Sequence, residues 1–105
     1  MEVAFGINGD SLVVKLNGEI DHHSCETARR KTDKQFIEKR LRDMEIDLSG
    51  VTFMDSSALG FVMGRMKIVK SLGGKLYITG VKKEFSKMIK LSGLESIVEI
   101  SYGEE

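Results

Sequence analysis

The sequence predicts a single α/β domain over residues 1–105, with a mainly parallel sheet, helices packed on it, and an antiparallel edge from an N-terminal hairpin. Short apolar runs alternate with longer segments whose apolar residues recur at helical spacing, in the order β-β-α-β-α-β-α-β. Strands that alternate with helices favour right-handed crossovers and parallel pairing. A chain of 105 residues also supports one hydrophobic core better than two.

The first two strands form the hairpin. Apolar residues fill segments 3–7 and 12–16, and Asn8-Gly9-Asp10 between them is typical of a tight turn, because asparagine and glycine tolerate positive φ. A helix is then expected over about residues 22–41. Its apolar face would consist of Cys25, Ala28, Thr32, Phe36 and Ile37.

The middle of the chain gives a strand and a second helix. Residues 44–49 have a strand pattern that ends at Ser49-Gly50, and residues 51–54 continue as an apolar segment. Asp55-Ser56-Ser57 is a strong helix-start signal, because short polar side chains accept hydrogen bonds from the free N–H groups of a first turn. The helix is expected to run to about residue 72, where Gly73-Gly74 ends it.

A strand over residues 76–78, a third helix and a final strand over residues 97–100 complete the predicted fold. Gly93 is expected to form a left-handed cap at the end of the third helix, and Leu94 to supply the hydrophobic contact of that cap. The apolar face of this helix would consist of Val81, Phe85, Met88 and Ile89.

Charge and cysteine content argue against several classes of function. Lysine plus arginine equals aspartate plus glutamate at 16 each, so no surplus of positive charge would attract nucleic acid or an anionic membrane. No apolar run approaches the roughly 20 residues of a membrane-spanning helix, and no signal peptide is expected. Cys25 is the single cysteine, which excludes an intramolecular disulfide and favours a cytoplasmic location.

Residues 47–60 contain the clearest candidate site, because a buried strand delivers the chain to Asp55, Ser56 and Ser57 at a helix start. One interpretation is structural: Asp55 or Ser56 is the N-cap and the others fill the first turn. Gly60 and Gly64 favour a second interpretation, since they follow Ser56 at i+4 and i+8 on one helix face. Each mid-helix glycine costs roughly 1 kcal/mol relative to alanine. The bare stripe would admit the backbone of a partner, or it faces a neighbouring helix of the same domain.

A phosphate on Ser56 would be compatible with this helix. A helix N-terminus stabilises an anion through its free N–H groups and the macrodipole. The phosphate would add roughly −1.5 to −2 charge beside Asp55. Such a charge would repel a partner bound tightly at the same surface.

The sequence resembles a known family at this site and elsewhere. Residues 54–60 (MDSSALG) look like the phosphorylation signature of STAS domains, the family named for sulphate transporters and anti-sigma factor antagonists. Residues 19–23 (EIDHH) and 91–94 (LSGL) resemble further landmarks in the order of the family, so the similarity covers essentially the whole chain. His22-His23 and Gly64-Arg65 look most like the sporulation member of the family.

The resemblance implies roles for individual residues. Ser56, directly after the aspartate, corresponds to the phospho-acceptor, and Asp21 to an acidic residue in a loop near that site. Asp21 is expected to serve phosphorylation or partner binding and not the fold. Ala58 stands where close relatives usually have glycine, and alanine favours helix there. The implied partner-binding surface consists of Asp21, Asp55, Ser57, Ala58, Gly60, Phe61 and Gly64.

The resemblance also implies a partner-switching cycle. The unphosphorylated chain would bind an anti-sigma factor that is also a serine kinase, and so release a sigma factor. Phosphorylation of Ser56 would dissociate the complex, and a serine phosphatase would reset it. The chain would then be an anti-sigma factor antagonist in sporulation, a monomer when free, without a cofactor, and a substrate of enzymes rather than an enzyme. An antagonist in a general stress-response module, or a subunit of a larger signalling assembly, is the alternative within the same class.

Other chemistry has weaker support. Asp21, Ser56 and His22 or His23 supply the residue types of a serine hydrolase, but no G-x-S-x-G elbow surrounds either candidate serine. A zinc site from the two histidines and Cys25 lacks a fourth ligand. A scaffold that binds a nucleotide or a lipid without being phosphorylated is a further alternative.

Overall fold

The computed structural model describes residues 1–103 of the chain. Its elements in chain order are β1 (Glu2–Asn8), β2 (Ser11–Ile20), α1 (His22–Glu38), β3 (Asp43–Met54), α2 (Ser57–Ser71), β4 (Leu76–Val81), α3 (Lys83–Ser92), the 3₁₀ turn η1 (Leu94–Ser96) and β5 (Glu99–Tyr102). The predicted order of strands and helices is confirmed, with η1 as an addition.

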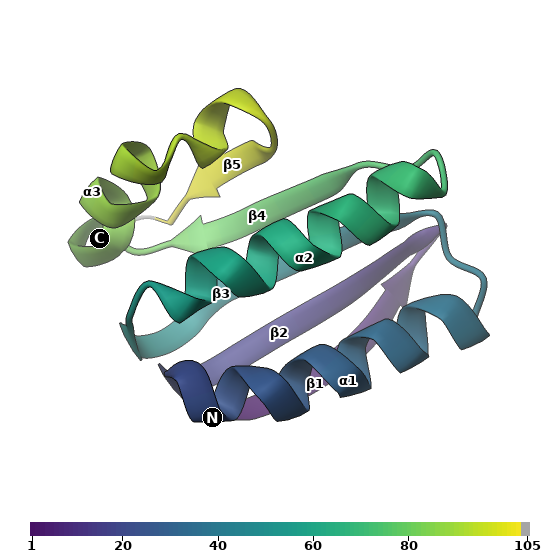
Figure 1. Cartoon of the computed structure of the whole chain (residues 1–105), viewed down its shortest axis with the longest axis horizontal. Coiled ribbons are helices and arrows are strands. Elements are labelled where there is room, and N and C mark those ends of the chain that lie inside the picture. Colours follow the sequence, from purple (N-terminus) through teal and green to yellow (C-terminus); the bar gives the residue numbers. More distant parts are fainter. Residues whose placement is uncertain (104–105) are drawn as a thin grey trace.

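The strands lie in the sheet in the same order as in the chain. Within the described residues the sheet has five strands, β1-β2-β3-β4-β5, with β1 antiparallel to β2 and the other neighbours parallel. Each parallel crossover moves the chain by one strand in the same direction, so right-handed connections place α1, α2 and α3 on the same face. Figure 1 shows these helices in front of the sheet, with α1 and α2 side by side.

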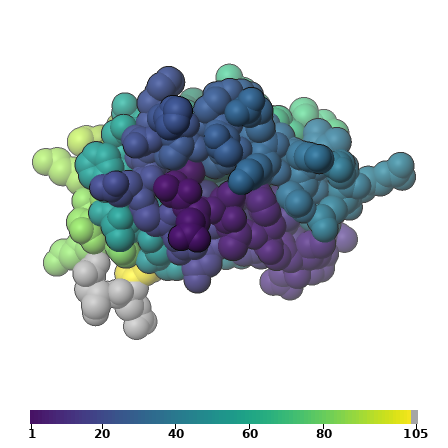
Figure 2. All heavy atoms as spheres, turned by 90° about the horizontal axis from the view of Figure 1, so that it is seen from below, coloured from purple at the N-terminus to yellow at the C-terminus, as the bar shows by residue number. Residues whose placement is uncertain are grey.

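The predicted N-terminal hairpin is confirmed. Gly9 adopts φ +62° in the turn, and Asn8 pairs with Ser11 across it. In the view from below, the purple atoms of β1 lie against the blue atoms of α1 (Figure 2). Most residues of β1 are nevertheless exposed, and only Val3 and Phe5 are partly buried.

The core lies between the sheet and its helices. Alternate residues of the central strands are buried, as the pleat requires, and the helices add large apolar side chains from their inner faces. Removing this surface from water stabilises the fold by about 25 cal/mol per Å². The most buried contributors from β2, β3 and the helices include Leu12, Val14, Leu16, Phe36, Met44, Ile46, Val69 and Ile89.

Three strands extend well beyond their predicted ends because pairing with neighbours overrides the local pattern. β2 continues to Ile20 instead of ending at Leu16. β3 continues through Ser49 and Gly50, and Gly50 pairs with Asn17 of β2 at a register shift. A side chain at position 50 would collide with Asn17, so glycine lets the two strands pass each other. Val81, which was expected to open the third helix, belongs to β4.

Ile37, which was expected on the apolar face of the first helix, is 56% exposed. Helix ends account for further differences. α1 ends at Glu38 rather than near residue 41, and Arg40 just beyond it adopts φ +52°, a left-handed conformation that stops a helix. The predicted cap at Gly93 is confirmed by its φ of +81°, and Leu94 beside it is buried. The final strand lies at Glu99–Tyr102 instead of residues 97–100, because η1 occupies the preceding residues. In the described part of the chain, the helices are too short or too polar to cross a bilayer.

The parallel strands β2 and β3 end side by side, and this arrangement positions the candidate site. Ile20, the last residue of β2, pairs with Met54, the last residue of β3. The N–H of Asp55 donates to the carbonyl oxygen of Ile20, with 3.2 Å between nitrogen and oxygen. The helices α1 and α2 therefore begin next to each other at the carboxyl edge of the sheet (Figure 1).

Candidate functional site

Asp21 caps the first helix. Its carboxylate accepts a hydrogen bond from the N–H of Ser24 at 2.8 Å, and the N–H of Asp21 donates to the Ser24 hydroxyl at 3.1 Å, which completes a capping box. These hydrogen bonds stabilise the charged carboxylate and hold the pKa of Asp21 below its usual value. The expectation that Asp21 does not serve the fold is therefore wrong, since it begins α1.

The second helix begins in a different way. The Oδ1 atom of Asp55 accepts hydrogen bonds from the N–H of Ser57, at 2.9 Å, and from the Ser57 hydroxyl. Ser56, between them, already has helical dihedral angles (φ −62°, ψ −15°), and its side chain makes no capping hydrogen bond. Of the two N-cap candidates, Asp55 provides the side-chain cap. The Ser56 hydroxyl is exposed and has no partner among residues 1–103.

Ser57 also contacts the first helix. The Sγ atom of Cys25 lies 3.8 Å from both the carbonyl oxygen and the hydroxyl oxygen of Ser57, where a thiol donates a weak hydrogen bond. Burial raises the pKa of the Cys25 thiol, which favours the protonated form that can donate. Ser57 is thus half-buried between the two helices, whereas Ser56 faces solvent.

The glycine stripe below Ser56 faces open space. A Cβ atom built on Gly60 or Gly64 would meet no heavy atom of the described chain within 4 Å outside its own helix backbone. The alternative in which these glycines pack against a neighbouring helix therefore has no contact to support it. The stripe forms one side of a shallow groove between α1 and α2, whose other lining residues are His22, Cys25, Glu26, Arg29, Ser57, Phe61 and Arg65.

Two of the predicted partner-binding residues are buried. Ala58 and Phe61 are each 5% exposed and belong to the hydrophobic core. Their side chains pack in the fold, which limits what they can offer to a partner. The other predicted residues of α2 and its preceding turn (Asp55, Ser57, Gly60 and Gly64) are exposed or half-buried.

A buried ion pair beneath the groove was not predicted from the sequence. Arg65 is only 4% exposed, and its Nε atom lies 2.7 Å from a carboxylate oxygen of Asp33 on α1. Arg65 also donates to the carbonyl oxygen of Phe61 and lies over its ring. Burial lowers the pKa of Arg65, and the charge of Asp33 opposes that shift. The spacing of four residues from Phe61 and from Val69 places Arg65 on the core face, a signal that predicts its burial but not its partner.

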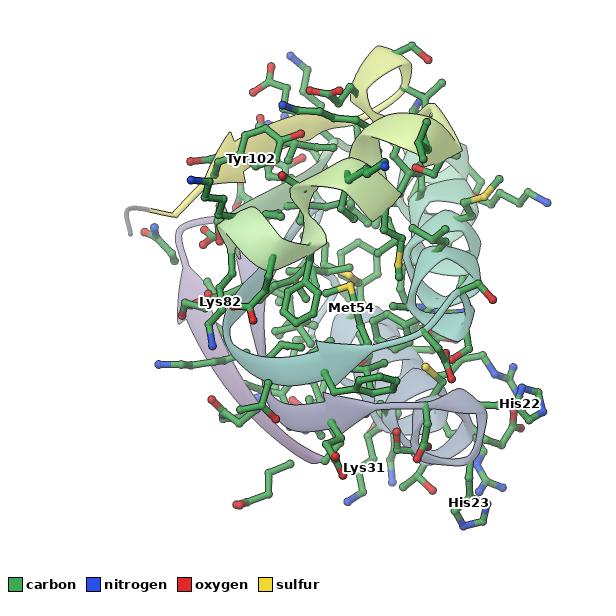
Figure 3. All side chains as sticks on the ribbon, turned by 90° about the vertical axis from the view of Figure 1, so that its left-hand side faces the viewer. His22, His23, Lys31, Met54, Lys82 and Tyr102 are labelled. Atoms are coloured by element: carbon green, nitrogen blue, oxygen red, sulfur yellow. The ribbon has the colours of Figure 1, made fainter. Side chains whose placement is uncertain are left out.

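The two histidines are exposed at the start of α1. His22 and His23 project into solvent from the start of α1, while Met54 points into the core (Figure 3). Within residues 1–103 neither histidine is hydrogen-bonded to a serine of α2 or its preceding turn, and a serine nucleophile needs a base within hydrogen-bond reach. The described residues also include no group of three or more His, Cys, Asp or Glu side chains that could hold a metal ion.

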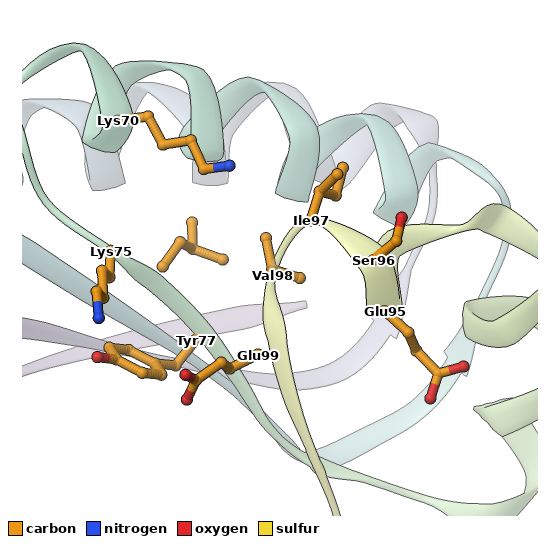
Figure 4. Close-up of a pocket in the computed structure, with 9 residues that line it drawn as sticks. Lys70, Lys75, Tyr77, Glu95, Ser96, Ile97, Val98 and Glu99 are labelled. Atoms are coloured by element: carbon orange, nitrogen blue, oxygen red, sulfur yellow. The ribbon is translucent and has the colours of Figure 1, made fainter.

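A second hollow lies between the last turn of α2, β4 and β5 (Figure 4). Cationic Lys70 and Lys75 line it together with anionic Glu95 and Glu99. This mixture of charges does not indicate one class of ligand. The predicted site residues are not among those that line it.

Comparisons with known proteins identify relatives along most of the chain. The model of the STAS domain family matches residues 2–105. The chain is 33% identical over 89 residues to the anti-sigma F factor antagonist of Paenibacillus polymyxa, which covers 85% of this chain and 76% of that protein. It is 32% identical over 94 residues to the anti-sigma-B factor antagonist of Bacillus subtilis, which covers 90% of this chain and 84% of that protein.

Solved structures share the fold. The anti-sigma factor antagonist SpoIIAA in its unphosphorylated form matches with a TM-score of 0.75 and 21% identity, covering 99% of this chain and 90% of that one. The phosphorylated form of SpoIIAA, a Bacillus cell fate determinant, matches with a TM-score of 0.74 and 25% identity over 94% and 90% of the two chains. By its sequence and by its arrangement of strands and helices, the chain belongs to the STAS domain family.

Proposed function

We propose that this chain is an anti-sigma factor antagonist and that phosphorylation of Ser56 abolishes its binding to an anti-sigma factor. The observation that carries the proposal is the exposed, unpartnered hydroxyl of Ser56 at the start of α2, beside the open face of Gly60 and Gly64. The relatives support it, since those with about a third of residues identical are antagonists of anti-sigma factors. SpoIIAA, which has the same fold, exists in phosphorylated and unphosphorylated forms.

The physical effect of the phosphate falls on binding rather than on folding. The positive end of the helix dipole favours an anion at Ser56, although the N–H groups of Ser57, Ala58 and Leu59 already donate to Asp55 and Ser56. The same anion, with roughly −1.5 to −2 charge, would have to be desolvated beside Asp55 when a partner covers this surface. A penalty of about 1.4 kcal/mol lowers affinity tenfold, so a modest clash dissociates the complex.

The proposed partner is an anti-sigma factor that also acts as a serine kinase with ATP, and a serine phosphatase restores the free hydroxyl. The cycle would take place in the cytoplasm. The anti-sigma F factor antagonists among the relatives favour a role in sporulation transcription. The anti-sigma-B relatives support a general stress-response module as the second candidate. Affinities for the anti-sigma F and anti-sigma B factors of the host organism would distinguish the two.

Binding measurements on Ser56 variants test the proposal. We expect Ser56→Ala to fold, to bind the anti-sigma factor like the unmodified chain, and to resist phosphorylation. Ser56→Asp should bind at least about tenfold more weakly, a loss of about 1.4 kcal/mol, with an unchanged thermal melt because a carboxylate suits a helix N-terminus. Ser101→Asp, at an exposed serine of β5, controls for the added charge. Equal affinities of Ser56→Asp and the unmodified chain would contradict the proposed switch.

A further inference from the structure

The start of α2 carries two adjacent serines of the same chemistry, and a kinase that docks here meets both. We infer that Asp55 directs the phosphate to Ser56 by holding the hydroxyl of Ser57, an inference that rests on the proposed function. Asp55 is thus a positioning residue, acting through the serine two positions later. Ser56, which lies between Asp55 and Ser57, then has the hydroxyl that is free to accept the phosphate.

The hydroxyl of Ser57 is engaged on two sides. It donates its proton to Oδ1 of Asp55, and the same oxygen of Asp55 accepts from the Ser57 N–H at 2.9 Å. The thiol of Cys25 approaches the Ser57 hydroxyl oxygen from α1, with 3.8 Å between sulfur and oxygen. The side chain is half-buried as a result. Ser56 has neither kind of partner among the described residues.

Phosphoryl transfer requires a serine hydroxyl that can turn away from its neighbours and reach the ATP bound by the kinase. The serine oxygen forms a bond to the γ-phosphorus of ATP, the bond from that phosphorus to the β–γ bridging oxygen breaks to release ADP, and the hydroxyl proton passes to a base of the kinase. Ser56 can present its oxygen without losing a hydrogen bond. Ser57 would first have to break its hydrogen bond to a carboxylate and turn out from between the helices.

The first helix provides a matched control. Asp21 caps α1 with the same side-chain chemistry as Asp55, but its carboxylate hydrogen-bonds to Ser24 and not to either serine at the start of α2. Removing Asp21 therefore removes a helix cap of the same kind without releasing Ser57. The control concerns only which serine takes the phosphate, because the rate of phosphorylation is itself expected to fall when Asp21 is changed. If the phosphate moves to Ser57 when Asp55 is removed but not when Asp21 is removed, the cause is the lost hydrogen bond between Asp55 and the Ser57 hydroxyl.

The test is a phosphopeptide map. The chain and its Asp55→Asn, Asp55→Ala and Asp21→Ala variants are incubated with ATP and the anti-sigma kinase of the host organism, and mass spectrometry locates the phosphate. The expected result is phosphate on Ser56 in the unmodified chain, Asp55→Asn and Asp21→Ala, because asparagine keeps the accepting oxygen. In Asp55→Ala the share on Ser57 should rise about tenfold, which corresponds to about 1.4 kcal/mol.

Other outcomes separate this inference from the proposed function. If Asp55→Ala keeps its phosphate on Ser56 in the unmodified proportion, the positioning role is overturned while the proposed function stands. If the unmodified chain accepts no phosphate, the proposed function fails. A second measurement needs neither the kinase nor a variant, so it tests the inference even if phosphorylation fails or Asp55→Ala folds poorly. In proton NMR of the unmodified chain, the Ser57 hydroxyl should exchange with solvent more slowly than the Ser56 hydroxyl. Equal exchange rates would overturn the inference.

Discussion

The two helices that begin at the carboxyl edge of the sheet both follow an aspartate. They differ in which of their first serines are hydrogen-bonded to it. Asp21 and Ser24, three positions apart, exchange hydrogen bonds and close the start of α1. Asp55 and Ser57, two positions apart, form their hydrogen bonds across Ser56 and leave its hydroxyl exposed. One residue of spacing therefore separates a helix start whose serine takes part in the cap from one that leaves a serine hydroxyl exposed.

We expect the largest effect from the ion pair between Arg65 of α2 and Asp33 of α1. Arg65→Met should lower the free energy of unfolding by about 1–3 kcal/mol, less than for a fully buried pair, because Asp33 is 26% exposed and can reach water. Urea unfolding with linear extrapolation measures this loss. Arg29→Met, which removes the exposed pair with Glu26, should change little. Equal stability of the two variants would show that α1 and α2 do not depend on the buried pair.

The glycine face of α2 should separate stability from binding. Gly64→Ala places a methyl group in open space, so the free energy of unfolding should rise by up to about 1 kcal/mol. The affinity for the anti-sigma factor should fall, because the methyl group obstructs close approach to the bare face. Thermal melts and binding titrations measure the two effects, with the exposed Lys67→Ala as a control on the same helix. A destabilised variant whose folded fraction binds normally would assign Gly64 to the fold.

We expect the melting temperature to depend on the hydrogen bonds that Asp21 makes as the cap of α1 and not only on its negative charge. Asp21→Ala removes the capping box and should lower the melting temperature, whereas Asp21→Asn should melt close to the unmodified chain because asparagine also caps well. We also expect Asp21→Asn to impair phosphorylation or kinase binding, as the family resemblance implies. Calorimetry and phosphorylation rates test the two parts separately. Equal melting temperatures of Asp21→Ala and Asp21→Asn would remove the capping role.

The smallest expected effect is a dependence on pH. Hydrogen bonds from Ser24 lower the pKa of Asp21 in the folded state, so the stabilisation from this carboxylate is complete above its ordinary pKa of 3.8. It is lost as pH falls through the lowered pKa of the folded state. The difference in melting temperature between the unmodified chain and Asp21→Ala should therefore narrow in acid. A difference that stays constant below pH 3.8 would show that the charge of Asp21 does not contribute.

Local sequence patterns predicted the order of elements, the hairpin turn and the left-handed cap at Gly93, because each depends on residues close together in the chain. The same patterns placed a helix start at Asp55. They could not show which of its polar side chains is the cap, since the answer depends on how Ser57 meets Cys25 of another helix. The passage of β3 through Gly50 likewise depends on Asn17 of the neighbouring strand.

The sequence contains a signal for the cap on α1, but this signal did not by itself identify the cap. Asp21 and Ser24 have the spacing of a capping box, but the box usually ends in glutamate or glutamine rather than serine. The ion pair of Arg65 and Asp33 joins residues far apart in the chain, and only the packing of α1 against α2 brings them together. Contacts of this kind follow from the fold and not from the sequence around either residue.

The order of the strands also bears on how the chain reaches this structure. Every strand of the described sheet pairs with the strand made immediately before it, so each addition closes a loop no longer than one helix and its connections. Folding slows as contacts join more distant parts of a chain, and this topology keeps those separations short for an α/β sheet. The sequence contains no proline whose isomerisation would delay the process. The residues that line the groove between α1 and α2 lie between His22 and Arg65, so the contacts that build it also join parts of the chain that are close in sequence.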